Sequence, residues 1–257
     1  MNNRTFSPRM SLRLSASLLL AGQLLFIVIT QFHAGGDANN HPAIFAAYAG
    51  DGIWTAVHLG QFASMTIMLA GLLSLVFSLN IQVEAVRWAG GFGAASIAAT
   101  LALYGVLQAV DGVALKQAVN AWANAPEAEK AARFASAETI RWLEWGVRSY
   151  QDFALGLGLL LFAAAMVRTS GIPRSIGYLM GLSGLAYLVQ GWVVGSGGFS
   201  LMHSVAIVLA WVLSLAWMSW LAVVAWRMQG SGLAKEAGDF PQPSGGSANA
   251  QAFLVSE

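Results

Sequence analysis

The sequence predicts an all-α, polytopic membrane protein: a bundle of six transmembrane helices with a short helical extracytoplasmic connector. Of the 257 residues, 57% are hydrophobic and only 10% are charged, whereas a typical soluble domain has about 25% charged residues. The apolar residues form six long runs, and a helix needs roughly 20 such residues to cross a hydrocarbon core of about 30 Å. Composition and run length together therefore indicate a membrane protein.

The runs predict spans at about 14–32, 53–79, 87–110, 139–167, 173–194 and 201–227 within a transmembrane domain at 1–228. The first run could instead be a signal peptide, but it is long for one and no Ala-x-Ala site follows it. Residues 111–138 are predicted to form an external helical connector, in which Asn124 caps a helix that runs on into the fourth span. Residues 229–257 are rich in Gly, Ser, Pro and Ala and predict a disordered cytoplasmic tail.

Basic residues predict the orientation, because cytoplasmic ends of spans carry an excess of Lys and Arg. One side of the predicted bundle holds Arg4, Arg9, Arg13, Arg87, Arg168, Arg174, Arg227 and Lys235. The uncharged segment 195–200 and most acidic residues lie on the other side. We therefore expect a multi-pass protein of the cell's inner membrane with both termini in the cytoplasm.

Polar residues within the spans gather at one depth. Counting about 20 residues outward from each cytoplasmic end, one core thickness, leads to the same level in five spans. Helical spacing of three or four places the following on shared faces: Trp54, His58 and Gln61; Tyr104, Gln108 and Asp111; Glu144, Arg148 and Asp152; and, in the last span, His203. These faces predict a polar pocket that opens outward.

The inner half of the bundle differs, because segments 66–79, 88–103, 153–167 and 207–226 contain no ionisable Asp, Glu, Lys, Arg or His. A proton relay across a membrane usually needs polar steps at that depth. The pattern therefore disfavours a proton-coupled transporter.

His58 and His203 are the candidate metal ligands. Two histidines from facing helices suit the axial positions of a haem b iron, with Arg148 or Arg141 at the propionates. With Asp51, Asp111 or Glu144 they would instead hold a single metal ion. His33 and His41, in the outer loop, could extend that site. The alternative is that each histidine is hydrogen-bonded to a neighbouring helix. The ligand hypothesis predicts that His58 and His203 lie close enough to share one ligand.

The carboxylates Glu144 and Asp152 are the candidate acid–base residues, with Arg148 anchoring an anionic group of the ligand. Pairing of these charges at i,i+4 is the alternative. Tyr104, Gln108, Asp111, Gln61 and Trp54 are expected to contact the ligand.

One stretch resembles a known pattern. The run His41-Pro42-Ala43-Ile44-Phe45 with Tyr48, Trp54 and Val57-His58-Leu59-Gly60-Gln61-Phe62 is similar to an uncharacterised bacterial family of small polytopic membrane proteins, a domain of unknown function. The resemblance implies a six-helix bundle and a site near His58, and it implies no activity.

Three classes of function stay open. The leading hypothesis is a site in the outer half of the bundle for a metal ion, haem or an amphipathic small molecule, used for redox or acid–base chemistry. The others are a small-molecule transporter or channel, and a non-catalytic scaffold acting through 111–138. The expected partners are the lipid bilayer, a lipid-soluble small molecule and a second copy of the chain. A net charge of +1 gives no reason to expect nucleic acid, and the lack of cysteine excludes thiolate metal sites.

Overall fold

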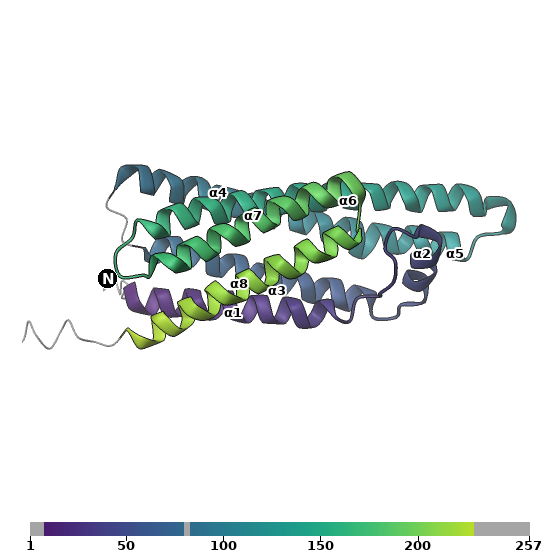
Figure 1. Cartoon of the computed structure of the whole chain (residues 1–257). Coiled ribbons are helices and arrows are strands. Elements are labelled where there is room, and N and C mark those ends of the chain that lie inside the picture. Colours follow the sequence, from purple (N-terminus) through teal and green to yellow (C-terminus); the bar gives the residue numbers. More distant parts are fainter. Residues whose placement is uncertain (1–7, 80–82, 229–257) are drawn as a thin grey trace, which may run out of the picture. The chain divides into compact units, whose positions relative to one another are not determined.

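The computed structural model describes residues 8–79 and 83–228, and within them all regular structure is helical, as predicted. In chain order the elements are α1 (Pro8–Thr30), α2 (His41–Gly50), α3 (Trp54–Ser78), α4 (Glu84–Ala109), the π-helix η1 (Val110–Leu115), α5 (Lys116–Ala123), α6 (Glu127–Val167), α7 (Arg174–Gly197) and α8 (Leu201–Arg227) (Figure 1). The chain divides into two units, Met1–Trp226 and Arg227–Glu257. Arg4, Lys235 and the predicted tail at 229–257 lie outside the described residues.

Among the described residues, six helices are long and apolar enough to cross a membrane, which is the pattern of a multi-pass membrane protein. They are Arg9–Thr30, Trp54–Ser78, Glu84–Ala123, Glu127–Val167, Arg174–Gly197 and Leu201–Arg227. Each overlaps one predicted span, and the first, second and fifth predicted spans run one or two residues past the helix. The third and fourth extend well beyond the prediction, because the chain stays helical into the connector and α6 runs without a break into the fourth span, as expected.

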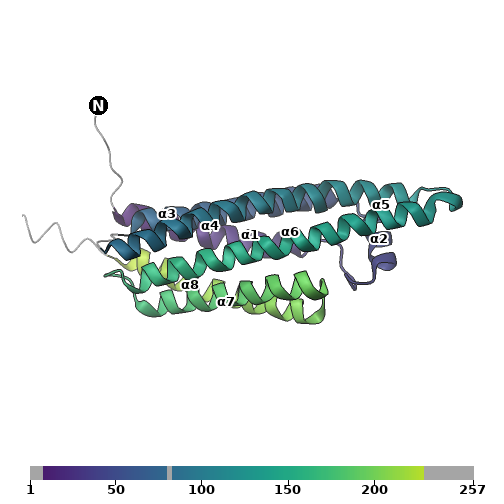
Figure 2. The same cartoon turned by 90° about the horizontal axis from the view of Figure 1, so that it is seen from above.

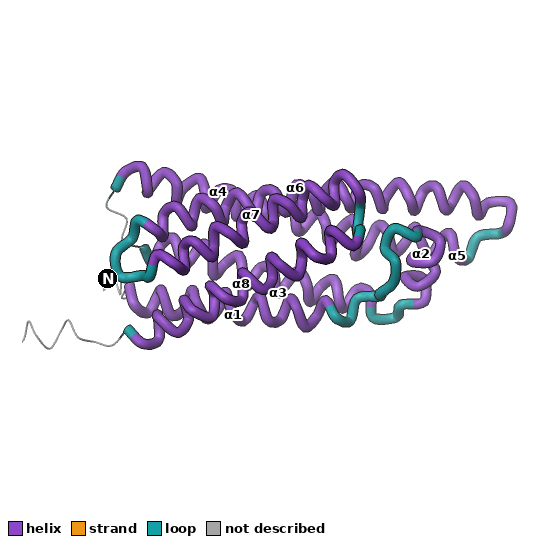
Figure 3. The backbone as a smooth tube through the Cα atoms, in the orientation of Figure 1, coloured by secondary structure: helices purple, strands orange, loops and turns teal. Residues whose placement is uncertain are grey.

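Within the first unit, α4 and α7 both pack on α6, and α1 packs on α3 (Figure 2). In the part of the chain that the structure describes, short loops join the helices, apart from the longer segment between α1 and α2 (Figure 3). We name the two ends of this unit by their elements. The α2–α5 end carries α2 and α5, and the α6–α7 end is where α6 gives way to α7.

Glycines allow the closest helix contacts. A Cβ on Gly156 of α6 would lie 2.7 Å from the carbonyl oxygen of Gly184 on α7, and a Cβ on Gly184 would lie 2.8 Å from the oxygen of Gly156. Close backbone approach at small residues is the usual way in which membrane helices associate, since lipid offers no hydrophobic driving force between them.

An apolar cluster holds the α2–α5 end together. Its buried members are Ile44, Phe45 and Tyr48 of α2, Trp54 of α3, Leu115 of η1, Val119 of α5 and Ala137 of α6. Lys116 closes the end of α2 by donating hydrogen bonds to the carbonyl oxygens of Tyr48, Ala49 (3.2 Å) and Asp51 (2.9 Å). The cluster fixes the loop after α1 over the ends of α3 and η1.

Two local expectations were wrong. The third span was predicted to end at residue 110, whereas its helix continues through Asp111 and Gly112 as the π-helix η1 and then as α5. Asn124 does not cap a helix start; it ends α5, and its Nδ2 donates to the carbonyl oxygen of Asn120 at 2.9 Å. Pro126 instead precedes α6, whose first turn carries Glu127 and Glu129, where acidic side chains favour a helix start.

Candidate functional site

Three side chains that can bind a metal meet at the α2–α5 end. They are His33 from the loop after α1, His58 from α3 and Asp111 from η1, and one ligand atom of each lies within 4.8 Å of the others. The Nε2 of His58 and the Oδ2 of Asp111 are 3.1 Å apart. Among the described residues this is the group of three or more such side chains that could hold one ion. We call it the His–His–Asp triad.

The backbone of α3 sets the tautomer of His58. Its Nδ1 lies 2.8 Å from the carbonyl oxygen of Trp54, one turn earlier. A carbonyl oxygen only accepts hydrogen bonds, so Nδ1 carries the proton and Nε2 of the neutral ring keeps its lone pair. That lone pair is on the side of Asp111.

His33 is held in the same manner. Its Nδ1 lies 3.1 Å from the carbonyl oxygen of Ala34, which leaves Nε2 with the lone pair. The ring centroid of His33 is 5.1 Å from that of His58 and 4.9 Å from that of Trp54. Burial lowers the pKa of His33, against the opposing charge of Asp111, and so favours the neutral ring.

The π-helix places Asp111. The indole Nε1 of Trp54 donates to the backbone oxygen of Asp111 at 3.2 Å, and the Asp111 side chain is only 13% exposed. A Cβ on Gly112 would lie 2.9 Å from the Cβ of His58. The glycine therefore lets η1 approach the imidazole, and a π-helix at such a position is a common feature of functional sites.

The triad has the electrostatics of a cation site. His58 Nε2 lies 3.1 Å from Asp111 Oδ2, and Asp111 Oδ1 is buried without a hydrogen-bond partner. A lone pair and a carboxylate that face each other repel unless a proton or a cation lies between them. Ligands bound to one ion at 2.0–2.2 Å are about 3 to 4 Å apart, so the distance suits a shared ion.

A cavity of about 300 Å³ adjoins His58. Its lining is mainly apolar and comes from α3, α4 and η1: Thr55, His58, Leu59, Phe62, Gly105, Gln108, Ala109, Gly112 and Val113. The Oε1 of Gln108 is buried without a partner. An apolar cavity with a few polar groups is the usual form of a small-molecule site.

Arg141 and Glu144 form a buried ion pair beside the triad, with 2.5 Å between Nη1 and Oε2 and side chains 2% and 3% exposed. The Nη2 of Arg141 donates to the carbonyl oxygen of Ala38 at 3.3 Å, and its guanidinium lies 4.6 Å from the Phe199 ring centre. This pair ties the loop after α1 to α6 and to the α7–α8 turn. Glu144 therefore pairs with Arg141 and not with Arg148.

A second polar cluster surrounds Arg148. Its Nε donates to the Oδ2 of Asp152 at 3.3 Å, the i,i+4 pairing that was the alternative to an acid–base role. The Nε2 of Gln190 on α7 donates to the same oxygen at 2.8 Å. Tyr104 and Tyr187 are close enough for the Arg148 charge to act on them. Asp152 is 1% exposed and its Oδ1 has no partner.

His203 belongs to this second cluster. Its ring contacts that of Phe199 at 5.0 Å, and Arg148 is its electrostatic neighbour. The ring contacts of His58 and of His203 involve different neighbours. That the two histidines share one ligand stays a prediction. Of the acids considered as partners of His58, the structure brings Asp111 to it.

The other predicted residues take separate places. Trp54 supports both His58 and Asp111, as described, whereas the Nε2 of Gln61 donates to the hydroxyl of Thr30 at 3.2 Å. Tyr104 lies within hydrogen-bonding reach of Gln108 and is buried. His41, expected in the outer loop, is the first residue of α2; it is buried, and its Nδ1 lies 2.7 Å from the Oε1 of Glu138.

Sequence reasoning undervalued His33 and Arg141. His33 lies in a loop whose path depends on packing between α2 and α5, and no spacing rule links it to His58. Arg141 is three residues before Glu144, so its competition with Arg148 for that carboxylate was visible in the helical spacing.

Comparisons with protein families, with curated proteins and with solved structures find no match to this chain. The resemblance to an uncharacterised bacterial family therefore stays an expectation.

Proposed function

We propose that the protein binds one divalent transition-metal ion, of the Zn²⁺ or Fe²⁺ kind, through His33, His58 and Asp111. The observation that carries this proposal is the convergence of the three ligand groups, with both histidines donating Nδ1–H to backbone carbonyls. Metal-bound histidines almost always donate their other nitrogen to a carbonyl, carboxylate or water, which fixes the ring and the tautomer.

Haem is less well supported than an ion. The 3.1 Å between His58 Nε2 and Asp111 Oδ2 leaves space for an ion and none for a porphyrin. Imidazole and carboxylate are the ligands of zinc and of non-haem iron sites, and three protein ligands leave coordination positions open.

The open positions suggest chemistry and not a purely structural ion. When bound, the ion would supply a positive charge that polarises water or a carbonyl group. Asp111 offsets part of that charge, and the two histidines hold the ligand geometry. The apolar cavity beside His58 suits a lipid-soluble small molecule that arrives from the bilayer.

The site would face away from the cytoplasm. We propose that the protein is in the bacterial inner membrane with both termini in the cytoplasm, because Arg87, Arg168 and Arg174 flank the spans at the α6–α7 end. This orientation puts the triad, at the other end of the unit, within reach of the extracytoplasmic side.

Titration of the detergent-purified protein with Zn²⁺ tests the metal site. We expect one ion per chain. Zn²⁺ affinity should be at least about tenfold weaker in His33→Ala, His58→Ala and Asp111→Asn, since loss of a group that only hydrogen-bonds to a metal ligand already lowers affinity by about that factor. His203→Ala is the matched control, because it removes a buried histidine that lies outside the triad. Wild-type protein that binds no Zn²⁺, or equal losses in His203→Ala and His58→Ala, would refute the proposal.

A further inference from the structure

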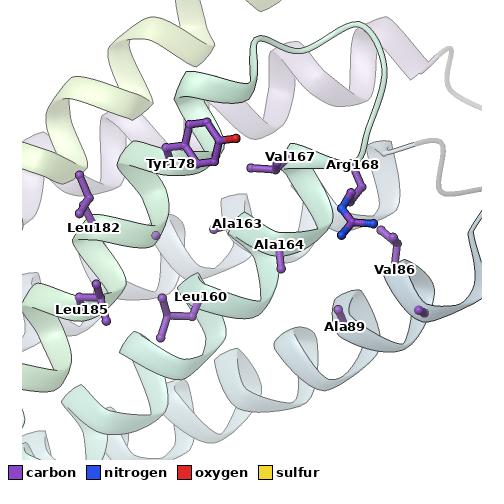
Figure 4. Close-up of a pocket in the computed structure, with 13 residues that line it drawn as sticks. Val86, Ala89, Leu160, Ala163, Ala164, Val167, Arg168, Tyr178, Leu182 and Leu185 are labelled. Carbon is purple, nitrogen blue, oxygen red and sulfur yellow. The ribbon is translucent and has the colours of Figure 1, made fainter.

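A second cavity lies at the α6–α7 end, whereas the triad lies at the α2–α5 end. It has a volume of about 660 Å³ and lies between α4, α6 and α7 (Figure 4). We call it the α4–α6–α7 groove. Its lining is almost wholly apolar and includes Ala85, Ala89, Leu160, Ala164, Gly181 and Leu185.

Small side chains open this groove. α4 and α7 both pack on α6, and six of the 13 residues that line the groove between them are alanines or glycines, which do not fill it. Ala164 of α6 is exposed, and a Cβ on Gly181 would meet only the Cβ of Ala163 at 3.5 Å. The groove is thus open to whatever surrounds the helices, which for membrane spans is lipid.

The length of the groove matches one leaflet. It extends along α6 from Leu160 to Arg168, and eight residues of helix rise about 12 Å. One leaflet contributes roughly half of the about 30 Å hydrocarbon core. An acyl chain lying along the groove would therefore have its headgroup near Arg168.

Arg168 is the charged residue in this lining. Figure 4 shows its guanidinium beside Val86 at the α4 edge of the groove, with Tyr178 across the opening. Arg168 is exposed and forms no ion pair with any residue that the structure describes. Arginine binds phosphate through paired N–H groups, and basic pockets between transmembrane helices are typical binding sites for anionic lipid headgroups.

We propose that an anionic phospholipid occupies the α4–α6–α7 groove, with an acyl chain against Leu160, Ala164 and Gly181 and its phosphate on Arg168. This site is independent of the metal site and shares no residue with it. The lipid would seal α4 against α7 on the surface of α6.

Lipid titration followed by native mass spectrometry tests the proposal. Phosphatidylglycerol and phosphatidylcholine with identical acyl chains are added to the full-length protein in detergent. We expect wild-type protein to prefer phosphatidylglycerol, and Arg168→Gln to lower its binding about fivefold, the effect of one basic residue near an anionic membrane surface. Arg9→Gln is the matched control, because Arg9 also lies near the end of a span but does not line the groove.

Ala164→Phe tests the apolar part of the site. The residue is exposed, so the larger side chain fills the groove without entering the core, and we expect it to reduce binding of both lipids. Three results would overturn the proposal: no lipid preference in the wild type, equal losses in Arg9→Gln and Arg168→Gln, or unchanged binding in Ala164→Phe. Retention of Zn²⁺ binding in these variants would show that the metal site and the groove are separate.

Discussion

Backbone contacts hold the imidazole of His58 on two sides. The carbonyl oxygen of Trp54 accepts its Nδ1–H at 2.8 Å, and Gly112 of η1 lies directly against its Cβ. These contacts leave the ring little freedom to turn, so Nε2 stays directed at Asp111. Pre-organisation of this kind is what distinguishes a ligand site from a chance meeting of polar side chains.

Gly112→Ala should therefore disturb the metal site. A Cβ at 2.9 Å from that of His58 must displace either the imidazole or η1, and we expect Zn²⁺ affinity to fall by about tenfold or more, as for loss of an outer support. Gly105→Ala on α4 is the control, because its Cβ would meet only Phe62, at 3.7 Å. Calorimetric titration measures both, and equal affinities in the two variants would contradict this account of Gly112.

The Arg141–Glu144 pair should matter far more to stability than a surface pair on the same helix. Arg141→Met leaves the Glu144 carboxylate buried and unpaired, which costs about 3 to 5 kcal/mol of unfolding free energy. Arg133→Met breaks a pair whose two side chains are each 53% exposed, and such pairs contribute about 0 to 1 kcal/mol. Denaturation in detergent compares the two, and similar losses would show that Arg141 is not a structural anchor.

Single residues also show where sequence reasoning works. Counting residues outward from the cytoplasmic ends placed His58, Asp111, Arg148 and Asp152 near one level, and the structure pairs His58 with Asp111 and Arg148 with Asp152. Helical spacing did not place His33 beside His58, because a loop has no regular period from which the position of a side chain could be inferred.

Among the elements, the continuous α4–η1–α5 segment differs most from expectation. Asp111-Gly112 resembles a helix end, since glycine often follows the last turn. Here the chain keeps its helical course through a π-helix, and the glycine serves the contact with His58. That contact is made by another segment of the chain and cannot be inferred from the local sequence.

The α6–α7 contact gives a prediction at this scale. Gly184→Ala places a Cβ 2.8 Å from the carbonyl oxygen of Gly156, so the helices must move apart, at a cost of about 1 to 3 kcal/mol. Gly146→Ala on α6 meets nothing within 4 Å and should be neutral or stabilising by up to about 1 kcal/mol, through helix propensity. Thermal unfolding in detergent measures the difference, and equal melting temperatures would contradict close glycine packing.

For the molecule as a whole, the spans were the most predictable feature. Each predicted span overlaps one of the six candidate membrane helices found among the described residues, because long apolar runs are a strong signal that needs no tertiary information. The apolar cluster at the α2–α5 end was not predictable in the same way. It depends on aromatic and aliphatic packing among Phe45, Tyr48, Trp54 and Val119, which come from three helices.

The proposed orientation can be tested with cysteines, since the chain has none of its own. Glu127→Cys at the start of α6 and Ser170→Cys in the α6–α7 turn place single thiols at exposed positions on opposite ends. In intact cells we expect a membrane-impermeant maleimide to label the first and not the second. The opposite pattern would place the triad on the cytoplasmic side.

X-ray absorption at the metal edge of the Zn²⁺-loaded protein examines the proposed metal site itself, because it reports the ligands bound to the ion. We expect nitrogen and oxygen ligands around the ion, with the outer-shell signal of two imidazoles, reduced to one in His58→Ala and unchanged in His203→Ala. A spectrum without imidazole, or one that His58→Ala leaves unchanged, would contradict the assignment of His33, His58 and Asp111 as a metal site.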